Sequence, residues 1–369
     1  MALDRNIGLP AIVLIMAGRL CLPQRHNTSH TSLTGAELKQ IDKNADTGVG
    51  PSARGMEIAS RFFWEVGLPV IEPRFPSYVD RIAAGLVAAG SDCSGNDDEV
   101  SRDSDWGPRF QVYLTEENHS EIGAALQAVL DGLPTTFDGI ECRSLGPHVN
   151  RVYSVNGFYA EKTSTEGGQG FAGPPASPID WLRIPESCLF DLTHGQVFYD
   201  PVGDFSERRR GFAAYYPDDV WRRRIAHTLA ECGEFGQRLL PRSLARDDYY
   251  TAEMAWWRFV EAAMRLGFLL NRRYAPSQKW LYREFCKLPR LAADVTNLLW
   301  DGQCDVPRRP ELVELISSAY TLGMSELGLC QPRGKAAGLS FAAQARDVLA
   351  GIANPEIARL AVSPDVMAR

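Results

Sequence analysis

The sequence has few of the features that mark zinc proteins, disulfide-rich secreted proteins or membrane proteins. Its eight cysteines include no Cys-x-x-Cys pair, so neither a zinc site nor a dense disulfide framework is indicated. A reducing cytosol is the simplest compartment for such a chain. The apolar run at residues 11–18 is shorter than the ~20 residues that span a bilayer, and Asp4 stands where a signal peptide would be basic. We therefore expect a cytoplasmic protein with no membrane partner.

The sequence also lacks an excess of positive charge and the most familiar catalytic motifs. Lys and Arg total 39 against 46 Asp and Glu, which gives a formal net charge of −7. Since general binding to DNA or RNA depends on a basic face, we expect no nucleic-acid partner. No Walker A, strand-linked G-x-G-x-x-G or G-x-S-x-G sequence occurs, so P-loop, Rossmann and serine-hydrolase folds are not indicated. Three arginine runs could each hold a triphosphate or form a solvated helix face: 208–210, 222–224 and 272–273.

Length and composition allow a sizeable core. The chain has 369 residues, of which 45% are hydrophobic and 23% charged, as is ordinary for globular proteins. This length suggests two domains, or one domain with a large appendage. Residues 23–54 show little apolar periodicity, so we expect residues 1–51 to be a leader or linker that is partly disordered.

Apolar periodicity divides the rest of the chain into a mixed part and a helical part. In the mixed part it predicts a buried core segment at 82–87, strands at 110–114 and 149–155, and a helix at 120–130. Beyond residue 180 the pattern is mostly helical. Helices are expected there at 218–229, 245–273, 277–288, 310–327 and 339–352. Helices joined by short loops suggest a bundle that packs against the mixed part.

The most informative segment begins at Gly90. Together with Ser91, this glycine lets the backbone approach an anion closely and offers an amide and a hydroxyl to a phosphate. Asp103 and Asp105 enter the apolar run 110–114, and alternate residues of a strand point to the same side. Paired carboxylates on one face suit Mg²⁺, which usually bridges to the phosphates of a nucleotide. A phosphate-binding turn ahead of a metal-binding strand suggests nucleotidyl transfer.

This arrangement resembles the nucleotidyltransferase superfamily typified by DNA polymerase β and the aminoglycoside nucleotidyltransferases. The core signature of that superfamily is Gly-Ser, a short spacer and Asp-x-Asp on a strand. More closely, the chain resembles the uncharacterised family DUF4037, and the resemblance runs from about residue 55 to about residue 289. It is carried by the string GSDCSGNDDEVSRDSDWG at 90–107 and by the segments 195–200, 215–221 and 273–280.

The resemblance implies an α+β fold with a nucleotidyltransferase-like mixed β-sheet core and a C-terminal α-helical bundle domain. We place the core at residues 52–212 and the helical domain at residues 213–369. In this arrangement a small-molecule acceptor would lie in the cleft between the two domains. The oligomeric state is not specified by any residue.

The resemblance also implies a reaction and a set of site residues. Asp103 and Asp105 would hold one or two Mg²⁺ ions against the phosphates of a nucleoside triphosphate, and Gly90 with Ser91 would bind those phosphates. Lys279 resembles the lysine that reaches the triphosphate from the helical domain, although it could equally be a solvated helix lysine. A nucleoside monophosphate would pass to a hydroxyl of the acceptor with release of pyrophosphate. AMP is expected from the resemblance to antibiotic adenylyltransferases.

The chain departs from the superfamily pattern at one position. Catalytic members carry a third carboxylate on a later strand, whereas the strand expected at 149–155 contains no Asp or Glu. Glu141 could substitute for it or could be a surface charge. The gap leaves room for a single-metal enzyme and for a catalytically reduced nucleotide-binding protein. It also leaves room for a metal-dependent enzyme that acts on a phosphorylated metabolite.

Several other residues near these motifs are expected to have structural roles. Asp98 is interpreted as a turn cap or as the partner of Arg102 in a salt bridge. Asp200 is interpreted as closing a hairpin or capping the next turn. Trp256 and Tyr274 are expected in the core or at a domain interface rather than as platforms for a nucleotide base.

Overall fold

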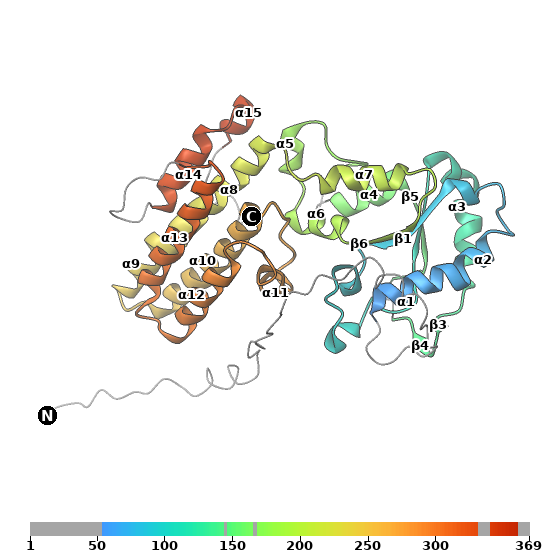
Figure 1. Cartoon of the computed structure of the whole chain (residues 1–369), viewed down its shortest axis with the longest axis horizontal. Coiled ribbons are helices and arrows are strands. Elements are labelled where there is room, and N and C mark those ends of the chain that lie inside the picture. Colours follow the sequence, from blue (N-terminus) through green and yellow to red (C-terminus); the bar gives the residue numbers. More distant parts are fainter. Residues whose placement is uncertain (1–53, 144–145, 165–167, 331–339, 361–369) are drawn as a thin grey trace, which may run out of the picture. The chain divides into compact units, whose positions relative to one another are not determined.

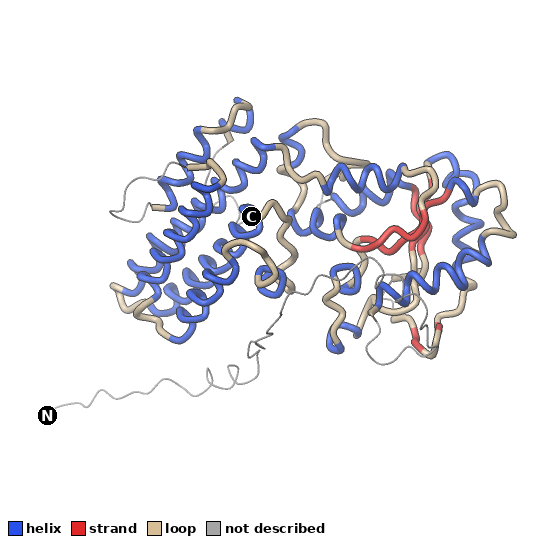
Figure 2. The backbone as a smooth tube through the Cα atoms, viewed as in Figure 1, coloured by secondary structure: helices blue, strands red, loops and turns tan. Residues whose placement is uncertain are grey.

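The structure is a computed structural model that describes residues 54–143, 146–164, 168–330 and 340–360. The leader or linker predicted over residues 1–51 lies outside these described residues. Figure 2 shows the strands gathered in one part of the chain and the C-terminal part built of helices. The predicted fold class, a mixed sheet with a helical C-terminal region, is confirmed.

A four-stranded mixed sheet positions the site. Its strands lie in the order β5-β2-β1-β6. Strand β1 (Ile82–Val87) pairs antiparallel with β2 (Gln111–Leu114) and with β6 (Gly195–Tyr199), whereas β5 (Arg151–Ser154) runs parallel to β2. Every residue of β1 is buried because helices cover both faces of this central strand. The strand predicted at 110–114 and the core segment predicted at 82–87 are confirmed.

Alternate strand residues contribute to two apolar cores, one on each face of the sheet. On the first face, Ala84 and Val112 pack with α1 (Gly55–Phe62) and α3 (Glu116–Asp131). On the second face the ring of Tyr113 stacks on the ring of Phe205 from α7, with the ring centroids 3.8 Å apart. The helices on this second face are α4 (Val155–Thr163), α6 (Glu186–Thr193) and α7 (Asp204–Ala213). The other α-helices and β-strands of this part are α2 (Leu68–Ile71), β3 (Thr136–Phe137), β4 (Ile140–Glu141) and α5 (Pro178–Trp181).

The C-terminal part consists of helices, the longest of which is α10 (Tyr249–Leu270). Asp248 caps α10 by accepting a hydrogen bond from the backbone N–H of Thr251 at 3.1 Å. The helix at 245–273 is therefore confirmed with slightly shorter bounds. Figure 1 labels these helices. They are α8 (Asp218–Cys232), α9 (Leu240–Leu244), α10, α11 (Leu281–Phe285), α12 (Ala292–Cys304), α13 (Arg309–Glu326), α14 (Phe341–Ala350) and α15 (Pro355–Ala358).

One apolar core runs through both parts of the described chain. The cluster that covers the second face of the sheet continues from Phe205 and Phe212 through Tyr215 to residues of α10 and α13. The Tyr274 hydroxyl donates to the carbonyl of Phe212 at 2.8 Å across the predicted boundary at residue 212. Among the described residues, no helix has both the length and the apolar character required to cross a membrane.

Candidate functional site

The site begins where β1 ends in a tight turn. Ala88 and Gly90 both have positive φ angles, of 51° and 81°. A Cβ atom on Gly90 would lie 2.3 Å from the carbonyl oxygen of Asp105 and 2.6 Å from Nη2 of Arg109. Only glycine fits this position, since it needs both the left-handed backbone and the open space. Ser91 follows and opens a short 3-10 helix that ends at Ser94.

A buried ion pair supports this turn from below. Arg109 donates to both carboxylate oxygens of Asp92, at 2.7 and 3.0 Å, and to the carbonyl of Ala89 at 2.9 Å. The two side chains are 4% and 0% exposed. Burial raises the pKa of Asp92, and the guanidinium of Arg109 opposes that rise. Because the cost of burying two charges offsets much of their attraction, the main effect of the pair is to hold the backbone beside Gly90 in place through the carbonyl of Ala89.

The two predicted metal-binding aspartates do not lie on a strand. Asp103 follows the short 3-10 helix Glu99–Arg102 and is exposed, and Asp105 lies at a bend with a φ of 47°. That left-handed angle is incompatible with extended backbone, and β2 begins only at Gln111. The expectation that both carboxylates point to the same side of a strand is therefore wrong. Asp105 faces the site described below, whereas Asp103 is not part of its lining.

Lys279 is brought to the same region by a clamp between two distant segments. Asn96 donates to Glu284 at 2.7 Å and accepts from Lys287 at 3.3 Å. Arg283 donates to Asp98 at 2.6 Å. These contacts hold α11 against the loop that follows the Gly-Ser turn, and Lys279 lies just before α11.

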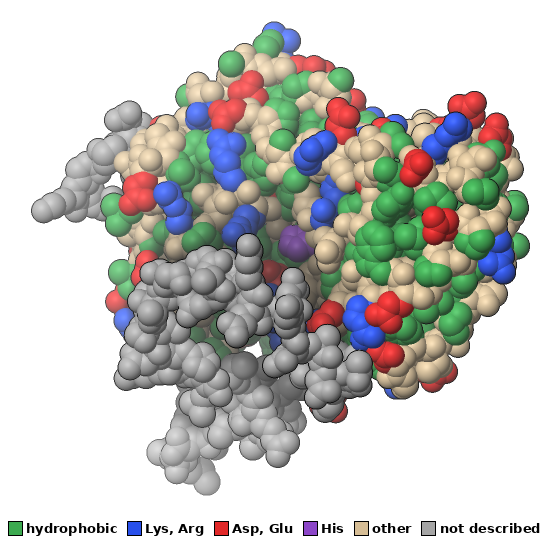
Figure 3. Space-filling model, turned by 45° about the vertical axis from the view of Figure 1, so that its right-hand side comes forward, with side chains coloured by type: hydrophobic (Ala, Val, Ile, Leu, Met, Phe, Trp, Pro, Cys, Tyr) green, Lys and Arg blue, Asp and Glu red, His purple; other side chains and the backbone are tan. Residues whose placement is uncertain are grey.

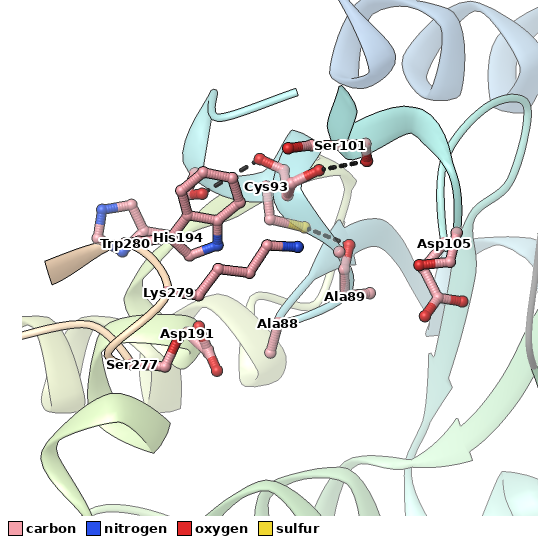
Figure 4. Close-up of a pocket in the computed structure, with 14 residues that line it drawn as sticks. Ala88, Ala89, Cys93, Ser101, Asp105, Asp191, His194, Ser277, Lys279 and Trp280 are labelled. Carbon is pink, nitrogen blue, oxygen red and sulfur yellow. Dashed lines mark hydrogen bonds between the residues drawn. The ribbon is translucent and has the colours of Figure 1, made fainter. Parts of the chain in front are cut away.

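The Gly-Ser turn, the end of α6 and the segment before α11 line an open cavity of about 260 Å³. Figure 4 shows Lys279 extending into it below Trp280, with Asp191 and Ala88 on the opposite side and Asp105 at the far end. Four of the five predicted site residues line it, namely Gly90, Ser91, Asp105 and Lys279. The remaining lining residues are Ala88, Ala89, Cys93, Ser94, Ser101, Ser104, Asp191, His194, Ser277 and Trp280.

Two titratable residues of the cavity, Asp191 and His194, are not predicted by any sequence motif. Asp191, on the last turn of α6, is exposed at the open cavity, and desolvation of its carboxylate by the nearby protein atoms raises its pKa to about 6 against the opposing charge of Lys162. Burial lowers the pKa of His194, whose ring stacks on Phe190 and whose Nδ1 lies 2.6 Å from the carbonyl of that residue. Neither residue belongs to a motif, because α6 meets the Gly-Ser turn only in three dimensions.

The thiol of Cys93 in the cavity has a structural contact. Burial raises the pKa of Cys93 to about 12, and its Sγ donates to the carbonyl of Ala89 at 3.0 Å. The dashed line to Ala89 in Figure 4 marks this bond. Cys93 therefore braces the turn that carries Gly90.

The donors in the cavity suit a hard cation that arrives with phosphates. Asp105, Ser91, Ser101 and Ser104 line the cavity, and the side chains of these residue types carry oxygen ligands of the kind that Mg²⁺ prefers. Within the described part of the chain, no three His, Cys, Asp or Glu side chains are grouped to hold a metal ion. Mg²⁺ often binds through one or two carboxylates plus substrate phosphates and water, so Asp105 fits that role.

The third carboxylate of the superfamily pattern has no counterpart on β5. Strand β5 indeed carries no Asp or Glu, and it ends at Ser154, whose side chain caps α4 by accepting from Gly157 N at 3.0 Å. Glu141 is exposed on β4 and does not line the cavity. Asp191 is the carboxylate that shares the cavity with Asp105.

The residues expected to be structural have structural contacts. Asp98 caps the 3-10 helix by accepting from Ser101 N at 3.0 Å, and its salt bridge goes to Arg283 rather than to Arg102. Asp200 accepts from Gly203 N and Ser206 N at 2.9 and 2.8 Å, which caps the start of α7. Trp256 and Tyr274 are buried, as expected.

These elements define an α+β protein in which a Gly-Ser turn, a carboxylate and a lysine from distant segments share one cavity. Residues 181–281 match the family described as a domain of unknown function, DUF4037. The resemblance to this family is therefore confirmed over that stretch. The stretch includes Asp191, His194 and Lys279 but not the Gly-Ser turn.

The other comparisons are weaker. No curated protein matches the chain. Among solved structures, a nucleotidyltransferase-like protein from Exiguobacterium sibiricum 255-15 has 9% sequence identity, with 73% of this chain and 81% of that chain covered and a TM-score of 0.33. A likeness with so low a TM-score supports no conclusion about this chain.

Proposed function

We propose that the cavity binds the phosphates of a nucleoside triphosphate and that the protein transfers a nucleoside monophosphate to a hydroxyl of a small molecule. The observation that carries this proposal is the meeting of Gly90, Ser91, Asp105 and Lys279 around one cavity. Lys279 comes from a segment that is distant in the sequence from the other three residues. Their residue types match what a phosphate chain with its cation requires.

Each side chain has a role that follows from its chemistry. Gly90 allows the phosphate to approach the backbone, and Ser91, whose hydroxyl donates to the carbonyl of Ser101 at 3.2 Å, can turn that donor toward a phosphate oxygen. Lys279 supplies a compact positive charge. Asp105 would hold Mg²⁺, which offsets charge on the phosphates when it is bound.

The charged side chains of the cavity affect how a triphosphate could bind. Two carboxylates, Asp105 and Asp191, line it together with a single lysine. A triphosphate alone would meet net repulsion there, so its binding should require a divalent cation. Asp191, with a pKa near 6, would accept the proton of the acceptor hydroxyl at neutral pH.

A second candidate function is nucleotide binding without transfer. The position of Asp103 outside the cavity favours it, because the paired carboxylates of the Asp-x-Asp pattern are not assembled. Binding and turnover must therefore be measured separately. For the donor we propose ATP, from the resemblance to antibiotic adenylyltransferases.

Isothermal titration of ATP, GTP, CTP and UTP, each with and without Mg²⁺, tests the binding step. We expect one nucleotide to bind only with Mg²⁺ and its binding to disappear in Asp105→Asn and in Lys279→Ala. Asp103→Asn is the matched control, since it makes the same chemical change two residues away and outside the cavity. If no nucleotide binds to the folded wild type, the proposed function is wrong.

Release of pyrophosphate tests the transfer step. The nucleotide that binds is incubated with Mg²⁺ and a metabolite extract, and pyrophosphate is measured for the wild type and for Asp191→Asn. Release by the wild type that falls in the variant supports transfer with Asp191 as the proton acceptor. Nucleotide binding without pyrophosphate release favours the binding protein.

A further inference from the structure

Some arginines of the three runs pair with acidic residues of the chain, whereas two others line a cavity. In two of the runs, Arg222 and Arg272 both pair with Asp218, at 2.8 and 2.9 Å. In the run on α7, Arg208 pairs with Asp204 and donates to the carbonyl of Ala172 at 2.9 Å. Each of these arginines therefore has an acidic partner. The next two residues of α7, Arg209 and Arg210, have different surroundings.

Arg209 and Arg210 line a second cavity, of about 310 Å³. It lies between α7 and β6, which is an edge strand of the sheet. The other lining residues are Thr193, Gly195, Gln196, Val197, Ser206 and Ala213. The lining thus has two positive charges and no carboxylate, the reverse of the first cavity.

The guanidinium of Arg209 is held in place without an anionic partner. Its Nε donates to the carbonyl of Leu192 at 3.2 Å, and its Nη2 donates to the carbonyls of Thr193 and Gly195 at 2.8 and 2.9 Å. No described residue accepts a hydrogen bond from its Nη1, and no described carboxylate pairs with Arg209 or Arg210. A fixed guanidinium with donors to spare is suited to a carboxylate or a phosphate.

The second cavity adjoins the first. Asp191 and His194 line the first cavity, whereas Thr193 and Gly195 line the second. The positive charge of Arg209 contributes to lowering the pKa of His194, after the larger effect of burial. The turn between α6 and β6 is therefore the shared wall of two sites with opposite charge.

We propose that the second cavity binds the carboxylate or phosphate group of a small molecule. That this molecule is the acceptor of the transferred nucleotide is a consequence that rests on the proposed function. It would then be an acidic metabolite with a hydroxyl near Asp191. Binding of the anionic group itself does not depend on nucleotide or metal.

Inorganic phosphate and succinate serve as probes for the two anionic groups. The unfolding temperature is measured for each probe without nucleotide or Mg²⁺, at ionic strength held constant with KCl. We expect at least one probe to raise the unfolding temperature of the wild type, because a ligand of the folded state stabilises it. The larger rise identifies the group that the site prefers.

Variants locate the bound anion. Arg210→Ala removes an exposed side chain and should leave the fold intact. Arg209→Lys keeps the positive charge but removes the planar guanidinium with its several N–H donors. We expect Arg210→Ala to weaken probe binding about tenfold, the loss of one charge-assisted hydrogen bond. Arg246→Ala, an exposed arginine that lines neither cavity, and Lys279→Ala in the first cavity should bind as the wild type does.

Three results would overturn the proposal. The first is that neither probe raises the unfolding temperature of the wild type more than KCl does. The second is that the stabilisation persists in both Arg210→Ala and Arg209→Lys. The third is that it is lost in Lys279→Ala, which would place the anion in the first cavity. Failure of the proposed function has a separate sign, the absence of Mg²⁺-dependent nucleotide binding.

Discussion

Replacing Arg109 alone should destabilise the protein more than replacing both members of its ion pair with Asp92. Arg109 donates twice to that carboxylate, at 2.7 and 3.0 Å, and both side chains are almost fully buried. Arg109→Met leaves the carboxylate without its partner in a site that water does not reach. Removing one member of a buried pair typically costs about 3–5 kcal/mol, and we expect a loss of that size.

The double variant Asp92→Asn/Arg109→Met leaves no charge in the site. Its remaining loss comes from the carbonyl of Ala89, which no longer receives the hydrogen bond from Arg109, at about 1–3 kcal/mol. The two changes should therefore be strongly non-additive in a double-mutant cycle, with the double variant losing about 2 kcal/mol less than Arg109→Met alone. A pair that contributed mainly by Coulomb attraction would give a different result, since the double variant would lose at least as much as Arg109→Met.

Urea unfolding of the wild type, both single variants and the double variant measures these differences. The midpoint gives the change in stability, and an unchanged m value shows that the surface exposed on unfolding is the same. Arg246→Ala, the removal of an exposed arginine, is the control and should shift the midpoint little. A loss below about 1 kcal/mol for Arg109→Met would refute the reasoning, because the carboxylate would then tolerate burial alone.

Two further predictions concern residues that line the first cavity, Asp191 and Gly90. Asp191→Asn should gain stability relative to the wild type as pH rises from 3.8 to about 6. The raised pKa means that ionisation of the Asp191 carboxylate destabilises the folded wild type. This loss of stability is absent below the interval and complete above it. The gain should reach at most about 1 kcal/mol, since the open cavity admits water, and urea midpoints across this range that differ by a constant amount would contradict it. Gly90→Ala should cost several times more than Gly95→Ala in thermal unfolding, because both glycines have positive φ but only at residue 90 would the Cβ meet other atoms, the nearest at 2.3 Å. Equal losses in the two variants would show that backbone strain alone decides the cost.

The elements of the sheet could be predicted because their apolar residues report burial directly. Strands β1 and β2 are short, wholly buried runs, and α3 has an amphipathic pattern. The end of β5 could not be placed in the same way. Its apolar pattern continues past Ser154, but the side chain of this residue caps α4, so the chain turns from strand to helix there.

Residues of the candidate site could be predicted only where the local sequence restricts the role that a residue can have. Gly90 could be recognised because a Gly-Ser turn has a specific backbone requirement, and Lys279 because of the segment that it follows. The strand position of Asp103 and Asp105 was wrong because the positive φ of Asp105 has no signature in composition or spacing. Asp191 gave no signal, since an acidic residue on a helix end is ordinary until the fold places it in a cavity.

The turn from Asp191 to Gly195 links these observations. Gly195 has a φ of 96°, and a Cβ there would lie 2.2 Å from the carbonyl of Leu86, so the turn is fixed against the end of β1 just before the Gly-Ser turn. Arg209 fixes the same turn from the other side through the carbonyls of residues 192, 193 and 195. The wall between the two cavities therefore has contacts on both of its sides. Under the proposed function, the length of the acceptor between its acidic group and its reacting hydroxyl is set by this wall.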